Sequence, residues 1–371
     1  MKKVGIITFH RALNYGSVMQ AYALQTKIKE LYPDYAAETI DYYPPNIKKI
    51  RSIFVPVKSL RNIVRNVTAL AYYPSFAKRR KSFDKFLDTH LKIGKKYNEN
   101  DNMANLDEQY DILVAGSDQI WNNVTKDFSL KYFFPDSEKA KKVSYAPSVG
   151  NGMFERGVNE DIFNALSKFS CISVREKTGS EKLKSFLDAE HIPVVIDPTL
   201  LISKEEYETI SSKKFMKGDY IFMYTIKNQE RFLKAVKDIS EKTGLPVVTV
   251  FAGQASFRVY SYGVKMSTHS SPEDFLALIR DAKLVVTDSF HGTAFSVVYQ
   301  KPFYSFCTKD ASTRDARIDT LLSKIGLEDR MLFFEDYERD GYLNELNYSS
   351  VEEKLEAFKA QSVDYLTDSL I

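Results

Sequence analysis

The segment that best indicates the fold class of this chain reads Leu284-Val285-Val286-Thr287-Asp288-Ser289-Phe290-His291-Gly292-Thr293. Its apolar start is short, β-branched and continuous, which is typical of a parallel strand covered on both faces. A helix-like pattern follows and ends near Pro302. The sequence therefore predicts an α/β fold in which the polar turn lies at the carboxyl end of a strand, where open α/β sheets bind ligands.

This turn holds the first candidate site residues. His291 is the candidate catalytic residue, and Asp288, Ser289, Gly292 and Thr293 are candidate substrate-binding residues. The first N–H groups of a helix lack partners and its dipole is positive at that end, so a helix beginning here favours an anion. The alternative is a buried histidine that only hydrogen bonds to neighbouring carbonyl groups.

Composition narrows the class of protein. With 371 residues, 44% hydrophobic and 27% charged, we expect two globular domains and a cytoplasmic location. The two cysteines form no metal-binding or disulfide pattern, so no metal is predicted. No stretch reads as a signal peptide or membrane span. A net charge of +3 predicts no nucleic-acid partner.

Positive charge is concentrated in one segment. Residues 48–96 hold fourteen Lys or Arg and two acidic residues, which gives +12 and leaves −9 for the rest of the chain. Aromatic and aliphatic residues are interleaved with this charge, so the segment fits an anionic membrane surface or a polyanionic acceptor. The alternative is a solvated basic helical pair on the first domain. Phe83, Phe86 and Leu91 have helical spacing and predict core contacts.

Strand and helix patterns alternate twice along the chain. We expect one Rossmann-like domain over residues 1–205 with the basic helical insertion 48–96, and another over 218–345. A C-terminal helix within 346–371 is expected to pack back on the first domain. The expected strands are 4–9, 37–41, 112–115, 142–145, 171–174, 194–196, 220–225, 246–251, 284–287 and 302–307, and the expected helices are 15–31, 229–242, 272–280 and 351–366.

Polar turns at other strand ends hold further candidates. Asn14, Tyr15, Gly16 and Ser17 begin a helix suited to an anion or sugar hydroxyls, but the GxGxxG dinucleotide fingerprint is absent. The turn Gly116-Ser117-Asp118-Gln119-Ile120-Trp121 places a carboxylate and an aromatic ring beside a glycine. Ser148 lies in a third such turn. In the second turn, Trp121 fits a carbohydrate site or a core anchor equally well.

Arginines supply the remaining candidates. Arg175 directly follows an expected apolar strand, and its planar guanidinium group can form a bidentate contact with a carboxylate or phosphate. The alternative is a structural pair with Glu176 or Asp197. Lys309, Arg314 and Arg317 form a second cationic cluster. No nucleophile elbow, HExxH, Walker A or Cys/His metal motif is present.

Several of these motifs, in this order, resemble the polysaccharide pyruvyl transferase family. The resemblance covers positions 5 to about 330. It rests on Gly5-Ile6-Ile7-Thr8-Phe9, Asn14-Tyr15-Gly16, Gln20-Ala21-Tyr22-Ala23-Leu24-Gln25, Gly116-Ser117-Asp118-Gln119-Ile120-Trp121, Ser173-Val174-Arg175-Glu176, Asp197-Pro198-Thr199 and Thr287-Asp288-Ser289-Phe290-His291-Gly292.

The resemblance implies two Rossmann-like, doubly wound domains that face each other across a cleft, as in B-type glycosyltransferases. It implies transfer of pyruvate from phosphoenolpyruvate to a sugar as a ketal, with the acceptor on the first domain and the donor on the second. Arg175 and His291 match donor-binding positions. Family members often carry arginine where this chain has Ser289, so the phosphate-binding charge is expected from Arg317, Arg314 or Lys309, or the donor geometry differs.

The expected chemistry needs phosphoenolpyruvate as co-substrate and no other cofactor. His291 is expected to move a proton or stabilise the phosphate, and Asp118 to act as a base toward the acceptor. The acceptor sugar is lipid-linked, nucleotide-linked or polymeric, in capsule, exopolysaccharide or cell-wall glycan synthesis. The basic segment favours a lipid-linked acceptor at the inner membrane face. The alternatives are a nucleotide-sugar-dependent glycosyltransferase and a non-catalytic sugar- or phosphate-binding protein.

Overall fold

The chain divides into two compact units. The computed structural model describes residues 1–52, 54–226, 229–251 and 254–371. Unit 1 comprises Met1–Arg51, Leu87–Ile202 and Leu355–Ile371, and unit 2 comprises Ser52–Phe86 and Ser203–Lys354. We expected the whole basic segment 48–96 in the first domain, but most of it clusters with unit 2.

Unit 1 is built on a five-stranded parallel sheet in the order β3-β2-β1-β4-β5. This is the order of a Rossmann-like sheet. The strands are β1 (Lys3–Ile7), β2 (Ala36–Tyr42), β3 (Ile93–Tyr97), β4 (Ile112–Ala115) and β5 (Lys141–Ser144), and the helices are α1 (Tyr15–Leu31), α2 (Pro45–Ile50), α4 (Leu106–Gln109), α5 (Glu160–Leu166) and α6 (Lys177–Leu187).

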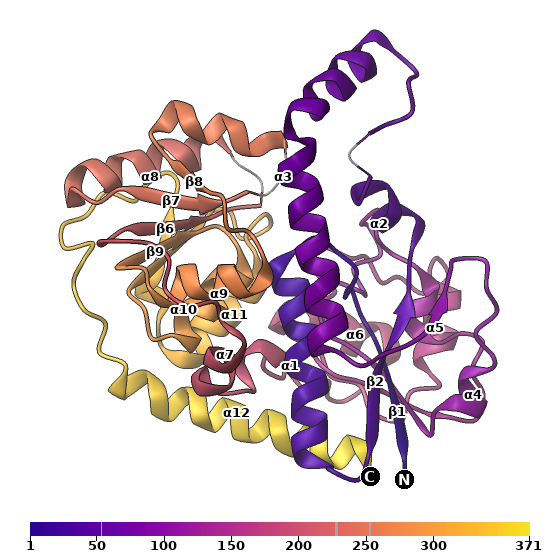
Figure 1. Cartoon of the computed structure of the whole chain (residues 1–371). Helices are drawn as coiled ribbons and strands as arrows, with labels where there is room; N and C mark the ends of the chain where they lie inside the picture. Colours follow the sequence, from indigo (N-terminus) through magenta and orange to yellow (C-terminus); the bar gives the residue numbers. More distant parts are fainter. Residues whose placement is uncertain (53, 227–228, 252–253) are drawn as a thin grey trace. The chain divides into compact units, whose positions relative to one another are not determined.

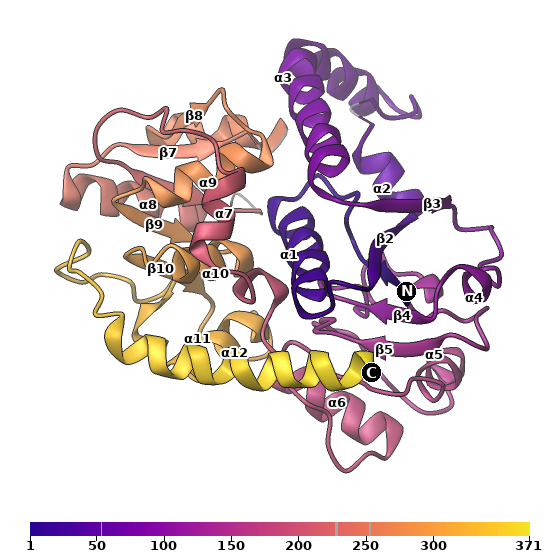
Figure 2. The same ribbon diagram turned by 60° about the horizontal axis from the view of Figure 1, so that its bottom comes forward.

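Helices cover both faces of this sheet. Figure 2 shows α1 on one face and α4 and α5 on the other. The last helix, α12 (Ser349–Leu370), contributes its C-terminal part to unit 1. There the Ser362 hydroxyl accepts a hydrogen bond from Ile196 N at 2.9 Å, and the Tyr365 hydroxyl donates to Ser144 O at 3.0 Å. The N- and C-termini lie side by side (Figure 1), with Lys2 Nζ donating to Ile371 O at 2.9 Å.

Unit 2 contains a six-stranded parallel sheet in the order β11-β10-β9-β6-β7-β8. Read in chain order, this is again the Rossmann arrangement. The strands are β6 (Ile221–Tyr224), β7 (Val247–Val250), β8 (Lys265–Ser267), β9 (Leu284–Thr287), β10 (Phe303–Cys307) and β11 (Met331–Phe333), and the helices are α3 (Leu60–His90, whose last turn belongs to unit 1), α7 (Lys204–Ile210), α8 (Glu230–Thr243), α9 (Pro272–Arg280), α10 (Phe290–Val298) and α11 (Ala316–Ile325).

Side chains of β6 point alternately to the two faces of the unit 2 sheet and contribute to the core on both. Ile221 and Met223 pack in one cluster with the buried face of α8. The rings of Phe222 and Tyr224 point to the opposite face and contact Phe275 of α9, at centroid distances of 5.9 and 4.9 Å. A strand buried on both faces explains why its sequence is a continuous apolar run. Figure 1 shows α8 on one side of these strands and α9 and α10 on the other.

Several expected elements differ from the structure. The expected strands 171–174 and 194–196 are wrong, because these segments form only isolated bridges, Val143 with Cys171 and Val174 with Val194. The basic insertion is one long helix, α3, and the edge strand β3, with the short α2 before them. The core contacts expected of Phe83, Phe86 and Leu91 are confirmed, since all three are buried. No helix in the described parts of the chain is long and apolar enough to cross a membrane.

Candidate functional site

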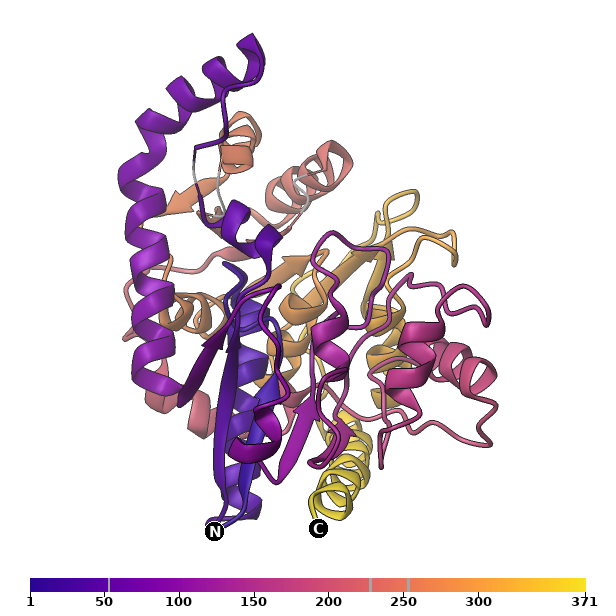
Figure 3. The same ribbon diagram turned by 90° about the vertical axis from the view of Figure 1, so that its right-hand side faces the viewer.

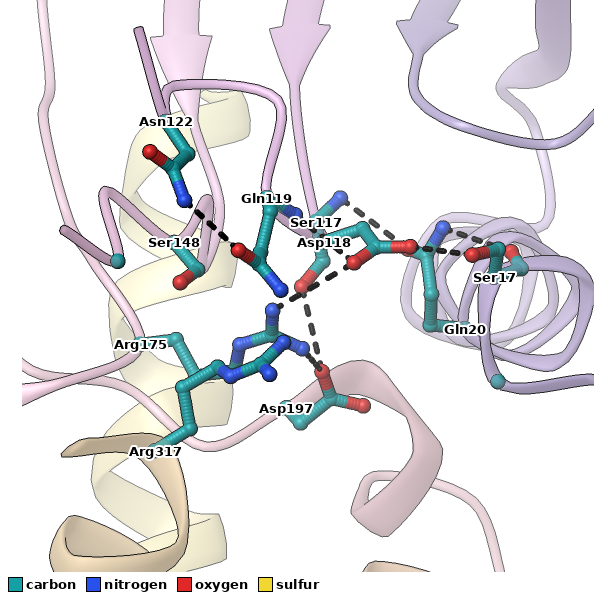
Figure 4. A network of polar contacts seen from close by, with 12 residues as sticks. Ser17, Gln20, Ser117, Asp118, Gln119, Asn122, Ser148, Arg175, Asp197 and Arg317 are labelled. Atoms are coloured by element: carbon teal, nitrogen blue, oxygen red, sulfur yellow. Dashed lines mark hydrogen bonds and ion pairs between the residues drawn. The ribbon is translucent and has the colours of Figure 1, made fainter. Parts of the chain in front are cut away.

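Unit 1 places its polar residues at the switch point of its sheet, between β1 and β4. Crossovers leave these two strands in opposite directions, which opens a crevice at their carboxyl ends. Ser17, in the first turn of α1, donates its hydroxyl to Asp118 Oδ2 at 2.5 Å. Asp118 directly follows the turn after β4, so this bond joins the two sides of the switch point (Figure 4).

Asp118 is buried and held from several directions. Its Oδ1 accepts from Gln119 N at 2.8 Å, and the Arg175 guanidinium lies 3.8 Å away. The hydroxyl of its neighbour Ser117 donates to Ala146 O at 2.7 Å, and Ser117 N donates to Gln20 Oε1 at 3.2 Å. The carboxylate therefore has a fixed orientation, as a general base or a hydroxyl-binding group requires.

Arg175 forms a buried ion pair with Asp197, one of the two partners considered for it from the sequence. The other oxygen of Asp197 accepts from Thr199 N at 2.9 Å and from the Thr199 hydroxyl at 2.6 Å. Ser117 also donates to Asp197, at 3.3 Å. Figure 4 shows Arg175 with its guanidinium directed toward Asp118 and Asp197.

Glu176, the other partner considered for Arg175, organises a loop instead. Its Oε1 accepts from the Ser148 hydroxyl at 3.0 Å, from Val149 N at 2.8 Å and from Gly150 N at 3.0 Å. Ser148 and Glu176 are both buried. Ser148 is therefore a buried residue of unit 1, as Ser117 is, and its hydroxyl donates to the Glu176 carboxylate.

The start of α1 is capped by its own sequence. Asn14 is the N-cap, and its Oδ1 accepts from Gly16 N at 3.0 Å and Ser17 N at 3.4 Å. Tyr15 is buried. Because the cap already satisfies two of the first N–H groups, this helix end is a weaker anion site than its sequence suggested.

A second carboxylate in unit 1 was not singled out from the sequence. Asp41, at the carboxyl end of β2, accepts from His10 Nε2 at 3.1 Å and from Arg11 Nε and Nη2 at 2.8 Å each. Burial raises the pKa of Asp41, but the hydrogen bonds and charges of His10 and Arg11 outweigh it and hold that pKa well below its ordinary value. The sequence did offer one indication of this site, because Asp41 is the last residue of the expected strand 37–41.

Trp121 is a core anchor. Its ring is fully buried and stacks on Phe133 at a centroid distance of 5.2 Å. Phe169 contacts it edge-on at 5.8 Å. The carbohydrate-stacking alternative for this tryptophan is therefore wrong.

Unit 2 repeats the same arrangement at its own switch point, between β6 and β9. Thr225, which follows β6, donates its hydroxyl to Asp288 Oδ2 at 2.9 Å, and Asp288 follows β9. Thr287 Oγ1 donates to Tyr224 O at 2.7 Å and accepts from Ser289 N at 3.0 Å. Thr225 is a site residue that was not predicted, although a polar residue at the end of an apolar strand is a signal for one.

The helix α10 begins immediately after this turn. Ser289 is its N-cap residue. Among the described residues, the Ser289 side chain makes no capping hydrogen bond to this helix. Thr293, one turn along, shares a 2.6 Å hydrogen bond with Ser305 of β10. A Cβ atom on Gly292 would lie 2.2 Å from Thr287 Oγ1, so only glycine lets α10 begin this close to β9. In contrast to α1, this helix end suits an anion.

His291 lies in the first turn of α10 and is buried. Its ring contacts that of Phe290 edge-on at a centroid distance of 5.2 Å. The Arg317 guanidinium lies 5.5 Å from the centre of the Phe290 ring. Arg317 is in turn held by Asp315, through bonds of 2.8 and 2.6 Å. A cationic side chain therefore lies beside the start of α10, although Ser289 supplies none.

The other two cationic candidates are engaged elsewhere in unit 2. The Arg314 guanidinium donates to Thr308 O at 3.1 Å and Lys309 O at 2.7 Å, and lies 3.3 Å from Asp319. Lys309 Nζ is 3.6 Å from Asp336, and both side chains are largely exposed. Of the three, Arg317 is the one that packs on the first residue of α10.

Unit 2 also contains a cavity of about 370 Å³ near the carboxyl ends of β7 and β8. Helix α3 forms one wall. It is lined by Tyr72, Pro74, Ser75, Lys78, Phe251, Tyr260, Met266, Ser267, Thr268 and Ser270. None of the site residues expected from the sequence lines it. Across the described part of the chain, no group of three or more His, Cys, Asp or Glu is placed to hold a metal ion.

The predicted site residues divide between the two units. Unit 1 holds Asn14, Tyr15, Gly16, Ser17, Ser117, Asp118, Ser148 and Arg175, and unit 2 holds Asp288, Ser289, His291, Gly292, Thr293, Arg314 and Arg317.

Solved structures with similar folds define the class. A protein of Listeria monocytogenes described as a UDP-N-acetylglucosamine 2-epimerase has a TM-score of 0.52 and 10% identity, over 99% of this chain and 90% of that one. The UDP-GlcNAc 2-epimerase of Methanocaldococcus jannaschii gives 0.52 and 11%, over 96% and 92%. MnaA of S. aureus with UDP gives 0.50 and 10%, over 96% and 87%.

At such low identity these likenesses establish the fold alone. Together with the two Rossmann-type sheets, they define the chain as a protein of the B-type glycosyltransferase fold. Within that class, the sequence model of the family "Polysaccharide pyruvyl transferase" matches residues 14–307. The chain belongs to this family. No curated protein matches it significantly.

Proposed function

We propose that this protein transfers pyruvate from phosphoenolpyruvate to a sugar that offers two neighbouring hydroxyls, forming a ketal. The observation that carries the proposal is His291 in the first turn of α10 with Arg317 packed on the neighbouring Phe290, within a chain that belongs to the pyruvyl transferase family. Phosphoenolpyruvate carries a phosphate and a carboxylate, and a helix start flanked by an arginine suits such an anion.

The proposed reaction proceeds through a cationic carbon. A proton adds to the methylene carbon of phosphoenolpyruvate, and the first sugar hydroxyl attacks the neighbouring carbon. The bond from that carbon to the phosphate oxygen breaks, and the second hydroxyl closes the ketal. Two C–O bonds form and one breaks. One hydroxyl proton balances the new methyl group, and the other leaves with the phosphate.

His291 is assigned to the proton or to the departing phosphate, because imidazole can donate or accept a proton near neutral pH. Arg317 and the first N–H groups of α10 are assigned to phosphate stabilisation, which commonly contributes the largest share of the rate. Asp118 is assigned to the acceptor, as the base toward a sugar hydroxyl. Arg175, the other family position, belongs to unit 1 and pairs there with Asp197.

The direct test is release of phosphate from phosphoenolpyruvate in the presence of a panel of nucleotide-linked, lipid-linked and polymeric sugars. Mass spectrometry should detect an acceptor heavier by one pyruvate less one water. His291→Gln should lower the rate about 10²- to 10⁴-fold, the usual contribution of a general acid or base. Unchanged phosphate release in this variant would exclude His291 from the chemistry.

A matched control keeps this test specific. His191 is an exposed histidine on a loop of unit 1, so His191→Gln makes the same chemical change outside both switch points. It should leave phosphate release unaltered. Thermal unfolding of both variants should resemble that of the natural protein, which separates a chemical role of His291 from a packing role.

A further inference from the structure

Residues 54–73 form a compact local structure, which we call the basic hook. The chain from Phe54 runs back alongside the first turns of α3 (Figure 3). Asn66 binds both backbone groups of Val55, accepting from Val55 N at 2.9 Å and donating to Val55 O at 2.8 Å. Asn62 donates to Pro56 O at 2.8 Å. These bonds fix one polar side of the helix against the preceding segment.

The opposite side of the same helical turns is apolar and exposed. It is formed by Leu60, Ile63, Val64, Val67 and Leu70, with exposed fractions of 81, 44, 63, 60 and 60%. At about 100° per residue these positions span an arc of about 120°. Ala69, on the far side of the helix, is fully buried. Soluble proteins seldom expose a continuous apolar stripe of this kind, so it is expected to be covered by another surface.

Charge indicates what covers it. From residue 42 to residue 83 the chain contains no Asp or Glu, and the hook itself carries Lys58, Arg61 and Arg65. Both arginines follow apolar residues of the arc directly, so their guanidinium groups flank it. Two copies of the hook would repel each other. An anionic surface with an apolar layer beneath it matches both the charge and the stripe.

The hook is attached firmly to unit 2 through the second half of α3. Lys78 Nζ donates to Thr268 O at 3.2 Å, and Ser75 and Lys78 line the unit 2 cavity together with residues of β8. Pro74 divides the exposed half of the helix from the packed half. The exposed stripe is therefore presented by a helix whose other end is part of the folded unit, and it is not a loose tail.

We propose that the basic hook docks on an anionic membrane surface, with the arc of Leu60, Ile63, Val64, Val67 and Leu70 entering the interface and Arg61 and Arg65 binding lipid phosphates. The helix then lies in the plane of the membrane, as amphipathic helices with a basic flank do. The docking is independent of the proposed reaction. If both hold, an acceptor carried by a lipid would be collected at the surface on which the enzyme sits.

Vesicle binding tests the proposal with the full-length protein. Co-sedimentation with vesicles of phosphatidylglycerol and phosphatidylcholine should exceed that with phosphatidylcholine alone, and should weaken as salt is added. Val64→Glu/Val67→Glu should abolish binding. The matched control is Val124→Glu/Val158→Glu, which changes two equally exposed valines of unit 1, with exposed fractions of 51 and 72%, and should bind normally.

A second pair of variants separates charge from burial. Arg61→Gln/Arg65→Gln should weaken binding to the anionic vesicles about 30-fold, since each basic residue near such a surface contributes about fivefold. Val67→Trp should show a blue-shifted emission on adding the anionic vesicles, while the fully buried Trp121 serves as a constant background.

Three outcomes would overturn the proposal. The first is equal sedimentation with neutral and anionic vesicles. The second is equal binding by Val64→Glu/Val67→Glu and its control. The third is an assembly of several copies that these two substitutions convert to a monomer, with no lipid binding by either form, which would make the stripe a protein contact. None of these results depends on whether phosphate is released from phosphoenolpyruvate.

Discussion

The hydroxyl of Ser17 donates a 2.5 Å hydrogen bond to Asp118 across the switch point of the unit 1 sheet. Thr225 and Asp288 make the equivalent bond, at 2.9 Å, across the switch point of unit 2. In each unit the hydroxyl follows the first strand of the sheet, and the carboxylate follows the strand that begins the second half of the topology. In each unit, a hydroxyl–carboxylate hydrogen bond therefore orients one carboxylate at the sheet edge where open α/β sheets bind ligands.

Removing either hydroxyl should destabilise its unit. Ser17→Ala and Thr225→Val each leave a buried or half-buried carboxylate without one donor, which typically costs about 1–3 kcal/mol. Urea unfolding should show the loss. Ser350→Ala and Thr209→Val, at exposed positions in helices, are the controls and should change stability by less than about 0.5 kcal/mol. Equal effects at buried and exposed positions would contradict the assigned role of these bonds.

The pair of Arg175 and Asp197 should be strongly coupled. Asp197→Asn leaves the buried Arg175 charge without its ion pair and should lower the free energy of unfolding by about 3–5 kcal/mol. Arg175→Met/Asp197→Leu removes both charges and should recover much of that loss. A double-mutant cycle measured by urea unfolding checks this expectation.

A conservative substitution defines what Arg175 does for activity. If Arg175 binds the donor, Arg175→Lys should raise the KM for phosphoenolpyruvate even at a temperature where the variant is fully folded, because lysine lacks the planar fork. A purely structural arginine would change stability alone and leave that KM unaltered in the folded variant.

Arg317 and Arg314 should differ in their effect on the donor. Arg317 packs on the first residue of α10, so Arg317→Ala should raise the KM or Kd for phosphoenolpyruvate about 10- to 100-fold, the worth of one hydrogen bond to a charged group. Arg314 binds carbonyl groups of its own loop, so Arg314→Ala should mainly lower the melting temperature. The reverse ranking would show that Arg314 supplies the phosphate-binding charge.

The Asp41 carboxylate should make stability depend on pH. Its folded pKa is held below the unfolded value near 3.9, so its contribution is fully present above that value and is lost as pH falls through the folded pKa. The stability difference between Asp41→Asn and the natural protein should therefore be largest near pH 7 and shrink below about pH 4. Urea unfolding from pH 7 to pH 3 tests this, with the exposed Asp34→Asn as control.

Much of the fold could be predicted from the sequence, because most elements carry a strong local pattern. The bounds of α1, α9, β4 and β9 agree with the expectation, since each has a buried face or a clear cap. The strand β3 was missed because Gly94, Lys95 and Lys96 make it a polar edge strand. Residues 171–174 are mostly apolar but form only two isolated bridges, which depend on neighbours that no local pattern reveals.

The candidate site was harder to predict for the same reason. Motifs placed Asp118 and His291 after apolar strands, which the structure has as β4 and β9, whereas residues 171–174 before Arg175 form only isolated bridges. Their partners were beyond the reach of a local pattern, because Ser17 and Asp118 are separated by 101 positions and Thr225 and Asp288 by 63. The choice between Arg317 and Arg314 as the phosphate-binding residue could not be predicted either, because it depends on the packing of Arg317 on Phe290.

Calorimetric titration with phosphoenolpyruvate and, separately, with UDP-N-acetylglucosamine distinguishes pyruvyl transfer from a nucleotide-sugar reaction. We expect that phosphoenolpyruvate binds the natural protein, that Arg317→Ala weakens this binding, and that the UDP-sugar does not compete. Binding of the UDP-sugar without binding of phosphoenolpyruvate would contradict the proposed pyruvyl transfer and favour a nucleotide-sugar-dependent reaction on the same fold.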